Sequence, residues 1–287
     1  MSVLLGIVEG LTEFLPVSSA AHLRIVEALL KIPHADPYWT MYGLVVQSGA
    51  ILALCVLFVG RIVDFARTFP QGEGRNRNWI THPLSLTLIA FAFTSAPALL
   101  LHKWSEKNLG SPRAMALALI VGGAIMWVVD AWSERQDPDT NEVEEIGLIQ
   151  AIWIGLCQAV SAIFPGTSRT MSTITAGQMA GLTRPAALEF SFLLSIPTMI
   201  AATSWNFWKE MHSSGAAAAG AIAAQVTMSP ERWGVLLIGL LVSFVVAMGV
   251  VEWFLFWVRK HGFMMFAVYR ILLGGWLLIW GARIIGG

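Results

Sequence analysis

The chain has 287 residues, of which 56% are hydrophobic and 13% are charged, and its mean hydropathy is +0.67. A soluble domain carries roughly 25% charged residues, so this composition excludes an ordinary soluble protein and indicates several membrane-spanning segments. The formal net charge is zero, and therefore nothing favours nucleic acid as a partner. The two cysteines, Cys55 and Cys157, lie inside apolar segments and give neither a disulfide framework nor a metal motif.

Taken in chain order, apolar stretches of about 20 residues predict six transmembrane helices. They cover residues 40–59, 84–102, 113–132, 186–208, 233–257 and 264–285. The strict alternation of a membrane barrel is absent from these stretches, so the expected fold is an all-α polytopic membrane protein. Residues 60–83 and 133–146 are expected to be polar links. Residues 209–232 contain an Ala/Gly stretch that fits either a short interfacial helix or a mobile loop.

Two further apolar stretches, residues 2–30 and 147–182, are interrupted near their centres by proline and polar residues. Each interruption predicts two half-length helices around a break. Half-length helices cannot cross a bilayer, so both stretches are expected to form re-entrant helix-break-helix hairpins. Irregular backbone at membrane depth is tolerated only where it lines a cavity enclosed by protein.

An odd number of spans, three, separates the two hairpins, so they should enter the membrane from opposite faces. We therefore expect one membrane domain over residues 1–287, built as an inverted-topology repeat of about 1–132 and about 147–287. Such repeats place binding sites near the midplane, at the ends of broken helices. Lysine and arginine divide evenly between the two predicted faces, so the positive-inside rule does not fix the orientation.

The two breaks carry the same sequence pattern. Residues 6–19 read GIVEGLTEFLPVSS and residues 155–169 read GLCQAVSAIFPGTSR. The two segments align position by position. Each has a glycine, then Glu or Gln, then a proline beside apolar residues, and then hydroxyl residues. In this alignment Glu9 corresponds to Gln158, and Ala20 corresponds to Arg169. The pattern predicts two halves of one buried polar site that differ in charge and meet tip to tip.

In the first break, Glu9 and Glu13 are four residues apart and share one face of a helix. Two carboxylates at this spacing repel each other, more strongly in a low-dielectric site. A divalent cation such as Mg²⁺ or Ca²⁺ removes the conflict, because these ions prefer carboxylate oxygens. The alternative is an interfacial pair that faces water.

Ser18, Ser19 and His22 follow Pro16 closely. A helix that restarts after the proline would have Ser18 and Ser19 in its first turn, where a hydroxyl can cap exposed N–H groups. Ser19 and His22 are three residues apart, so the imidazole could act as a base toward a hydroxyl nucleophile. We expect Ser18 to bind the substrate phosphate, with a capping role as its alternative, and Ser19 and His22 to have catalytic roles.

The second break contributes hydroxyl groups and a positively charged arginine side chain. Thr167, Ser168 and Arg169 open its second half-helix, and Thr173 lies four residues beyond Arg169. Free N–H groups at a helix N-terminus bind anions, and a guanidinium fork suits phosphate. The alternative is that Arg169 snorkels, so that its guanidinium reaches the lipid headgroups. Carboxylates with a metal, a hydroxyl with an imidazole and an arginine together indicate phosphoryl transfer. Gln47 and Glu189, each inside a predicted span, are secondary candidates, and Glu189 is expected near Arg184.

These motifs resemble those of the bacterial undecaprenyl pyrophosphate phosphatase family, the bacitracin-resistance family. The likeness covers residues 9–19 with His22, residues 165–169, residues 46–50 (VQSGA) and residues 189–194 (EFSFLL), and hence nearly the whole chain. The resemblance implies an enzyme that hydrolyses undecaprenyl pyrophosphate to the monophosphate carrier of cell-wall synthesis. It also implies a divalent metal and an active site that faces the periplasm from the inner membrane.

Carried over residue by residue, the resemblance makes Glu9 and Glu13 the acidic pair, Ser19 the nucleophile and His22 the histidine of the first motif. Ser168, Arg169 and Thr173 match the second motif. Two departures stand out. Ala20-Ala21 replaces the usual Thr-Gly, and Met171 replaces a usual glycine, where its bulk would narrow the pocket or shift the helix.

Several alternatives stay open. A transporter or flippase for a lipid phosphate would also have an inverted repeat with broken helices, but it gives Ser19 and His22 no task. His22 is the alternative nucleophile to Ser19. The prenyl chain length is unspecified, and so is the oligomeric state, for which a homodimer is one alternative. The expected partners are a polyprenyl pyrophosphate substrate and membrane lipid.

Overall fold

The structure is a computed structural model that describes residues 1–32, 36–71, 78–109, 111–213 and 229–285. Within these ranges it is helical, with one isolated bridge between Thr140 and Leu182 in place of any sheet. Six described helices are long and apolar enough to cross a membrane, which confirms the six predicted spans. They are α3 (Pro37–Leu57), α5 (Pro83–Leu109), α6 (Pro112–Ser133), α9 (Arg184–Ser213), α11 (Pro230–Val258) and α12 (Met264–Ile284).

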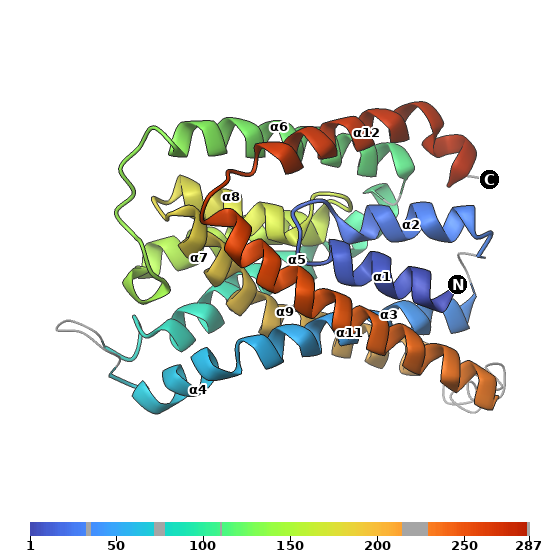
Figure 1. Cartoon of the computed structure of the whole chain (residues 1–287), viewed down its shortest axis with the longest axis horizontal. Coiled ribbons are helices and arrows are strands. Elements are labelled where there is room, and N and C mark those ends of the chain that lie inside the picture. The colour runs from blue at the N-terminus through green and yellow to red at the C-terminus, as the bar shows by residue number, and fades with distance from the viewer. Residues whose placement is uncertain (33–35, 72–77, 110, 214–228, 286–287) are drawn as a thin grey trace.

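Shorter helices fill the two interrupted stretches. The first contains α1 (Ser2–Thr12) and α2 (Ser19–Leu29), and the second contains α7 (Leu148–Ile163) and α8 (Arg169–Met179). In Figure 1, α1 and α2 form a hairpin, as do α7 and α8. The helix–break–helix pattern predicted for residues 2–30 and 147–182 is therefore present.

The expected polar links differ in detail from the prediction. Residues 60–83 do not form a plain link, because the short amphipathic helix α4 (Val59–Thr68) follows α3 directly after a change of direction at Phe58. The 3₁₀ helix η1 (Val143–Glu145) lies in the second link. The Ala/Gly stretch, expected as an interfacial helix or a loop, lies in residues 214–228, outside the described residues.

Serine and proline begin two of the spanning helices in the same way. The Ser111 hydroxyl accepts a hydrogen bond from the N–H of Ala114 at 3.2 Å, and the Ser229 hydroxyl accepts one from Arg232 at 3.3 Å. Each serine is followed by a proline at the first helical position, where the missing N–H is not needed. The sequence therefore fixes where α6 and α11 begin.

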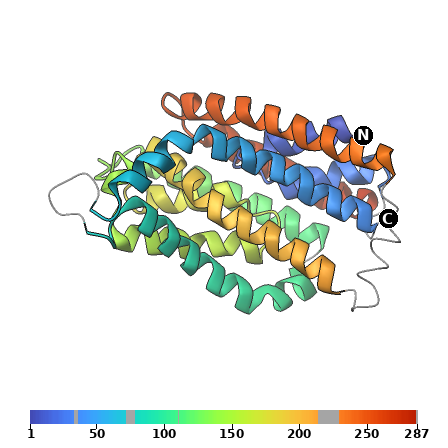
Figure 2. The ribbon, with the colours of Figure 1, turned by 90° about the horizontal axis from the view of Figure 1, so that it is seen from below.

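The helices pack in two groups around the hairpins. The pair α6 and α12 runs along one edge of the molecule (Figure 1). From below, α11, α3, α9 and α5 form a row of inclined helices in that order (Figure 2). The two hairpins occupy the space between this row and the α6–α12 pair, with α1 against α11 and α7 against α5. Both breaks are thereby enclosed by protein.

Glycine lets the first helix of each hairpin approach its neighbour closely. A Cβ on Gly6 would lie 2.8 Å from the carbonyl oxygen of Gly239 in α11. A Cβ on Gly155 would collide with the backbone of Ala90 in α5. Small residues allow such backbone approach in membranes, where packing replaces the hydrophobic effect as the force that joins helices. These are the same glycines that align in the repeated pattern.

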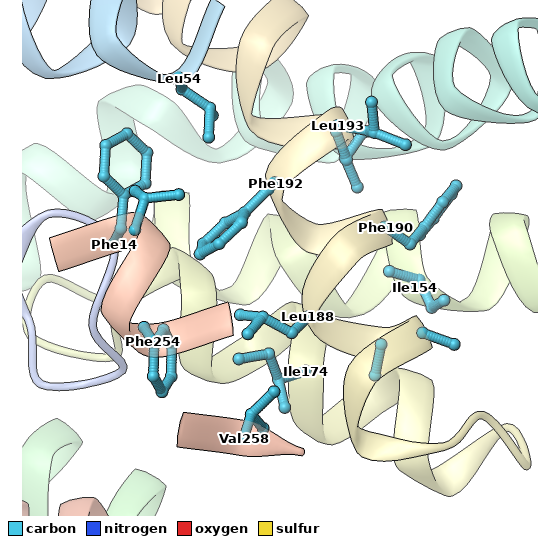
Figure 3. Packing of buried hydrophobic residues seen from close by; sticks show 14 of the residues in the cluster. Phe14, Leu54, Ile154, Ile174, Leu188, Phe190, Phe192, Leu193, Phe254 and Val258 are labelled. Carbon is cyan, nitrogen blue, oxygen red and sulfur yellow. The ribbon is translucent and has the colours of Figure 1, made fainter. Parts of the chain in front are cut away.

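A cluster of phenylalanine rings includes Phe14, which belongs to the first break. Phe14 and Phe192 are fully buried, and their rings meet edge to face with centroids 5.6 Å apart. Phe254 of α11 contacts the same Phe192 ring (Figure 3), and so does Phe58 at the junction of α3 and α4. Edge-to-face contacts of this kind favour one fixed arrangement. Phe14 follows Glu13 in the chain, so the core anchors the residue next to the polar site.

Candidate active site

The second helix of each hairpin starts from a serine in a left-handed backbone conformation. Ser18 has φ of 75° and precedes α2, and Ser168 has φ of 70° and precedes α8. Left-handed φ is uncommon for residues other than glycine and indicates a constrained backbone. The free N–H groups of α2 and α8 therefore begin at matching points of the two breaks.

Counted from these serines, the correspondence between the repeats shifts by one residue. Ser19 is the first residue of α2 and Arg169 is the first residue of α8. Counted from the helix starts, Arg169 corresponds to Ser19, whereas the sequence pattern aligned it with Ala20. The second break has one more residue between its proline and the following helix, and its Gly166 has φ of 96°. Ser19 and Arg169 therefore take the same place in their hairpins, at the first position of the second helix.

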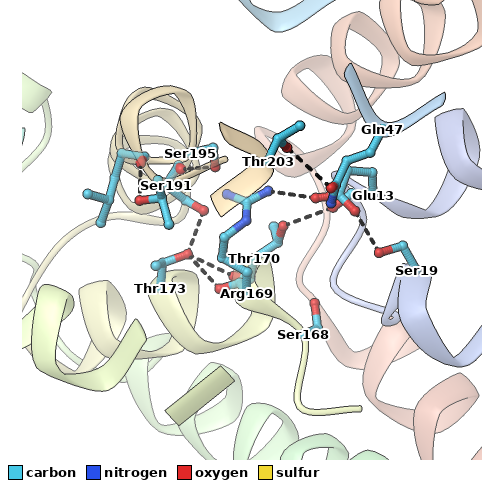
Figure 4. A network of polar contacts seen from close by, with 12 residues as sticks. Glu13, Ser19, Gln47, Ser168, Arg169, Thr170, Thr173, Ser191, Ser195 and Thr203 are labelled. Atoms are coloured by element: carbon cyan, nitrogen blue, oxygen red, sulfur yellow. Dashed lines mark hydrogen bonds and ion pairs between the residues drawn. The ribbon is translucent and has the colours of Figure 1, made fainter. Parts of the chain in front are cut away.

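The two breaks meet at Glu13. An oxygen of its carboxylate, Oε1, lies 3.2 Å from Nη2 of Arg169, and both side chains are largely buried (Figure 4). The Thr170 hydroxyl donates to the backbone carbonyl of Glu13 at 3.4 Å. A buried ion pair is strongly destabilised when one partner is removed, because the other charge is left uncompensated. The expected contact between the tips of the hairpins is thus formed.

The other carboxylate oxygen of Glu13 binds the first residue of α2. The Ser19 hydroxyl donates to Oε2 at 2.6 Å (Figure 4). This distance is typical of a short hydrogen bond from a hydroxyl to a charged acceptor. A carboxylate placed in this way can accept the hydroxyl proton, and Glu13 thus connects the Ser19 hydroxyl to the Arg169 guanidinium.

His22 points away from Ser19. Its Nδ1 lies 2.7 Å from the carbonyl oxygen of Ser18, which can only accept, so Nδ1 carries the proton. In the neutral ring, Nε2 then accepts from the Tyr269 hydroxyl at 2.6 Å. The described residues contain no hydrogen bond between Ser19 and His22, because both imidazole nitrogens are already used. The geometry therefore places the Glu13 carboxylate, and not the His22 imidazole, at the Ser19 hydroxyl.

Two buried polar atoms at the site lack a partner among the described residues. Glu9 is 1% exposed and its Oε2 makes no hydrogen bond, and the same holds for Nη1 of Arg169. The backbone N–H of Glu13 donates to the carbonyl of Glu9, so the helical spacing that puts both carboxylates on one face is preserved. An unsatisfied buried acceptor and donor are atoms to which a cation and an anion could bind.

The remaining hydroxyl residues of the breaks serve mainly to hold the helices. The Ser168 hydroxyl caps α8 by accepting from the N–H of Met171 at 3.4 Å, whereas no capping bond from the Ser18 hydroxyl is found in the described part of the chain. The capping role that was the alternative for Ser18 is therefore found at Ser168, and phosphate binding by Ser18 stays a prediction. Thr167 and Ser18 are both buried in the breaks.

Thr173 lies one turn below Arg169 and joins α8 to α9. Its hydroxyl lies 2.5 Å from that of Ser191 and also donates to the backbone carbonyls of Arg169 and Thr170 (Figure 4). With its hydrogen-bonding capacity used in this way, Thr173 supports the backbone under Arg169. Ser191 was not predicted as a site residue, although it lies in the stretch EFSFLL that carries the family resemblance.

The two secondary candidates, Gln47 and Glu189, lie in different polar surroundings. The Gln47 Oε1 accepts a long hydrogen bond of 3.5 Å from Thr203 (Figure 4). Glu189 does not lie beside Arg184 as expected, because its carboxylate pairs with Arg61 at 2.7 Å. Arg61 also binds Glu144, so Glu189 belongs to a polar network away from the breaks. Arg184 instead pairs with Asp130 at 2.7 Å.

Met171, which replaces a usual glycine, is buried and does not occupy the face where Arg169 meets Glu13. It lines a cavity of about 510 Å³ between α6, α7 and α8. Its Sδ accepts a weak hydrogen bond from the Thr175 hydroxyl at 3.6 Å. The narrowing expected from the bulk of Met171 therefore applies to this cavity and not to the site of the Glu13–Arg169 ion pair.

Sequence reasoning missed Arg270 and Tyr269 of α12. Arg270 is fully buried and donates to backbone carbonyls of both breaks, and Tyr269 holds His22. The available signal was an arginine inside a predicted span, which is a functional candidate by default. The described residues contain no group of three or more His, Cys, Asp or Glu side chains that could hold a metal, so a metal at Glu9 and Glu13 stays a prediction.

Comparison with known proteins identifies the family of this chain. The model of the family "Bacitracin resistance protein BacA" matches residues 2–276, a range that includes both breaks and Arg270. The chain belongs to the BacA family.

Relatives of this BacA protein share its full length. A protein from Koribacter versatilis named undecaprenyl-diphosphatase is 52% identical over 283 residues, which cover 99% of this chain and 98% of the relative. Proteins of the same name from Caldanaerobacter subterraneus and Lacticaseibacillus paracasei are 38% and 34% identical, over 94% and 97% of this chain and 92% and 96% of theirs.

Proposed function

We propose that this BacA protein is an integral membrane phosphatase that hydrolyses undecaprenyl pyrophosphate to undecaprenyl phosphate and inorganic phosphate. The names of its full-length relatives support this substrate. The observation that carries the proposal is Glu13, whose carboxylate binds the Ser19 hydroxyl and the Arg169 guanidinium at once. The reaction recycles the lipid carrier used in cell-wall synthesis, which fits the family's link to bacitracin resistance.

In the first step, the Ser19 Oγ attacks the terminal phosphorus. Its proton passes to Glu13, which lies 2.6 Å away. The bond between the phosphorus and the bridging oxygen breaks, and undecaprenyl phosphate leaves with the electron pair. In the second step, water attacks the phosphorus of the phosphoserine and the bond between phosphorus and Ser19 Oγ breaks. Glu13 returns its proton to Ser19 Oγ, and inorganic phosphate leaves with both hydrogens of the water.

Arg169 and the start of α8 are proposed to hold the phosphate. Nη2 of Arg169 is engaged by Glu13, whereas its buried Nη1 makes no hydrogen bond within the described residues. This free donor, with the first N–H groups of α8, can bind phosphate oxygens and offset the charge that develops on them. The Glu13–Arg169 pair would keep the guanidinium in place before the substrate arrives.

The residues present fit a divalent cation. Glu9 and Glu13 share a helix face, and the buried Oε2 of Glu9 has no partner in the described part of the chain. Carboxylate oxygens are the ligands that Mg²⁺ and Ca²⁺ prefer. When bound, the ion would supply positive charge to the pyrophosphate. We propose that Glu9 and Glu13 hold it.

We also propose that the two hairpins are re-entrant and related by an inverted repeat. At 1.5 Å per residue, the 11-residue helix α1 is about 16 Å long, which is too short for a bilayer core of about 30 Å. The aligned glycines support the repeat, since Gly6 packs on α11 of the second half and Gly155 packs on α5 of the first half. Three spanning helices lie between the hairpins.

The proposed location is the bacterial inner membrane, with the active site open to the periplasm. Arg113 at the start of α6 and Asp137 beyond its end are both exposed and lie at opposite ends of this span. In this orientation, a membrane-impermeant thiol reagent should label Arg113→Cys but not Asp137→Cys in intact cells. Labelling of only the Asp137→Cys protein would reverse the orientation.

A transporter or flippase for lipid phosphates remains the alternative function. The inverted repeat would suit it, but transport gives the Ser19–Glu13 hydrogen bond no task. In detergent no transmembrane gradient exists, so a transporter releases no phosphate there. Stoichiometric phosphate release by the purified protein, lost in Ser19→Ala and Arg169→Ala, supports the phosphatase, and full release by both variants would overturn it.

A further inference from the structure

A fully buried arginine of α12 contacts the backbone of both hairpin breaks. Nη1 of Arg270 donates to the carbonyl of Pro16 at 3.0 Å. Its Nη2 donates to the carbonyls of Thr167 at 2.7 Å and Gly166 at 3.2 Å, with a longer contact to Ala118. One side chain therefore joins residues that are far apart in the sequence and belong to opposite halves of the proposed repeat.

These carbonyls lie immediately before the site. Pro16 comes three residues before Ser19, and Thr167 comes two residues before Arg169. Because a break interrupts the helical ladder, its carbonyls need partners from elsewhere when they are buried. Arg270 supplies them from a single rigid, planar group.

The guanidinium also fixes the backbone that leads into α8. Gly166 and Ser168 have φ of 96° and 70°, and the two carbonyls between them, those of Gly166 and Thr167, are the ones that Arg270 binds. Since a trans peptide group is planar, holding its carbonyl also sets the direction of the following N–H. These two hydrogen bonds from Arg270 thereby fix the direction in which α8 begins, and with it the position of its first residue, Arg169.

Arg270 is not held there by an ion pair. Among the described residues it forms no salt bridge, and its buried Nε has no hydrogen-bond partner. A buried cation in a membrane helix is costly and is normally paired with an acid or used by the protein. Backbone carbonyls of the two breaks are what offset the cost here, which ties the residue to the site.

The neighbouring helix leaves room for this side chain. A Cβ on Gly122 of α6 would lie 2.6 Å from Nη2 of Arg270 and 2.7 Å from Cε of Met171. The Met171 end can rotate away, but Nη2 is held by hydrogen bonds to the second break. An alanine at position 122 would therefore displace the guanidinium without removing its charge.

We propose that Arg270 is a positioning residue that holds the two breaks together, so that Ser19 and Arg169 converge on one phosphate. This inference rests on the proposed phosphatase activity for its kinetic consequences. Its structural consequence, joint immobilisation of the two breaks, does not depend on that activity. Arg270 acts through the backbone of the breaks and does not touch the substrate.

The test compares Arg270→Met and Arg270→Lys with Arg184→Met. Arg184 also ties helices together through a buried acid, Asp130, but it lies beyond the far end of α8. Hydrogen exchange should accelerate in residues 13–20 and 164–170 together in Arg270→Met and stay unchanged there in Arg184→Met. With a polyprenyl pyrophosphate, kcat of Arg270→Met should fall by ~100-fold, the loss that misplaced catalytic groups produce, while KM changes less than about threefold. Arg270→Lys should restore part of kcat.

Gly122→Ala provides a second test if Arg270→Met does not fold. It should accelerate exchange in the same two segments and lower kcat, whereas Gly275→Ala should do neither, because a Cβ at Gly275 meets no atom within 4 Å. Wild-type exchange in both segments of the folded variants would overturn the positioning role even if the wild type is an active phosphatase. Absence of phosphate release by the wild type would instead overturn the proposed function and leave the exchange result to decide on Arg270.

Discussion

Glu13 and Arg169 come from opposite halves of the chain, and their side chains form a buried ion pair of 3.2 Å. The same carboxylate accepts the Ser19 hydroxyl proton in a hydrogen bond of 2.6 Å. The three residues therefore act as one unit, in which neither half of the protein is complete alone. Each consequence below can be measured in detergent-solubilised protein.

The first prediction is a strong kinetic coupling between Glu13 and Arg169. Glu13→Gln and Arg169→Met should each lower kcat by ~10²–10⁴-fold, the range for loss of general-base or charge-stabilising groups. Because the residues act as a unit, the double variant should be little worse than the worse single variant. Glu189→Gln is the matched control, since it breaks the remote pair with Arg61, and its kcat should stay close to the wild-type value. Losses that multiply in the double variant would show that the two residues act independently.

The second prediction concerns the nucleophile. Rapid acid and base quenching during turnover, followed by mass spectrometry, should find phosphate on Ser19. Ser161→Ala should keep this label, because Ser161 only binds the carbonyl of Gln158 within α7. His22 has its Nδ1 on a carbonyl and its Nε2 on Tyr269, so neither nitrogen is free to attack. Acid-labile phosphohistidine at His22 would reverse this assignment.

The third prediction concerns the metal. Chelation with EDTA should suppress phosphate release, and Mg²⁺ or Ca²⁺ should restore it. Direct binding of Mn²⁺, followed by electron paramagnetic resonance, should weaken ~10–100-fold in Glu9→Gln, as expected for loss of an anionic group at the site. The unpartnered Oε2 of Glu9 is the reason for this expectation. Equal Mn²⁺ affinity in Glu9→Gln and the wild type would remove the metal from these carboxylates.

The fourth prediction concerns stability. Phe192→Ala should destabilise the protein by ~3–5 kcal/mol, because it removes a fully buried ring that three other phenylalanines contact. Leu100→Ala is the control, since Leu100 is 82% exposed in the isolated chain and faces the surroundings. Thermal unfolding in detergent should show a lower midpoint for Phe192→Ala alone. An unchanged midpoint would mean that the aromatic cluster does not support the break.

Much of the fold could be predicted from the sequence because a membrane-spanning helix needs about 20 consecutive apolar residues, which are visible in the sequence. Apolar length located the six spans, and Pro16 and Pro165 located the two breaks. The repeated pattern also predicted that the two breaks would meet at one polar site, where Glu13 contacts Arg169. The helix α4 was missed because its amphipathic stretch resembles a polar link when only hydropathy is considered.

The parts that the sequence did not predict depend on side-chain direction. Ser19 and His22 have the spacing of a hydroxyl–imidazole pair, but the position of Tyr269 across the bundle turns the imidazole away. Arg270 was missed because only packing shows whether a polar residue in a span faces lipid or a neighbouring break. The extra Gly166, with its left-handed backbone, shifted the alignment of Arg169 from Ala20 to Ser19.

The most direct test of the central claim is release of inorganic phosphate from undecaprenyl pyrophosphate by the purified protein in detergent. The wild type should release one phosphate for each undecaprenyl phosphate formed, and Ser19→Ala at equal folded concentration should release none above background. The claim would be contradicted if the wild type released no phosphate with Mg²⁺ or Ca²⁺ present, or if Ser19→Ala released it at the wild-type rate.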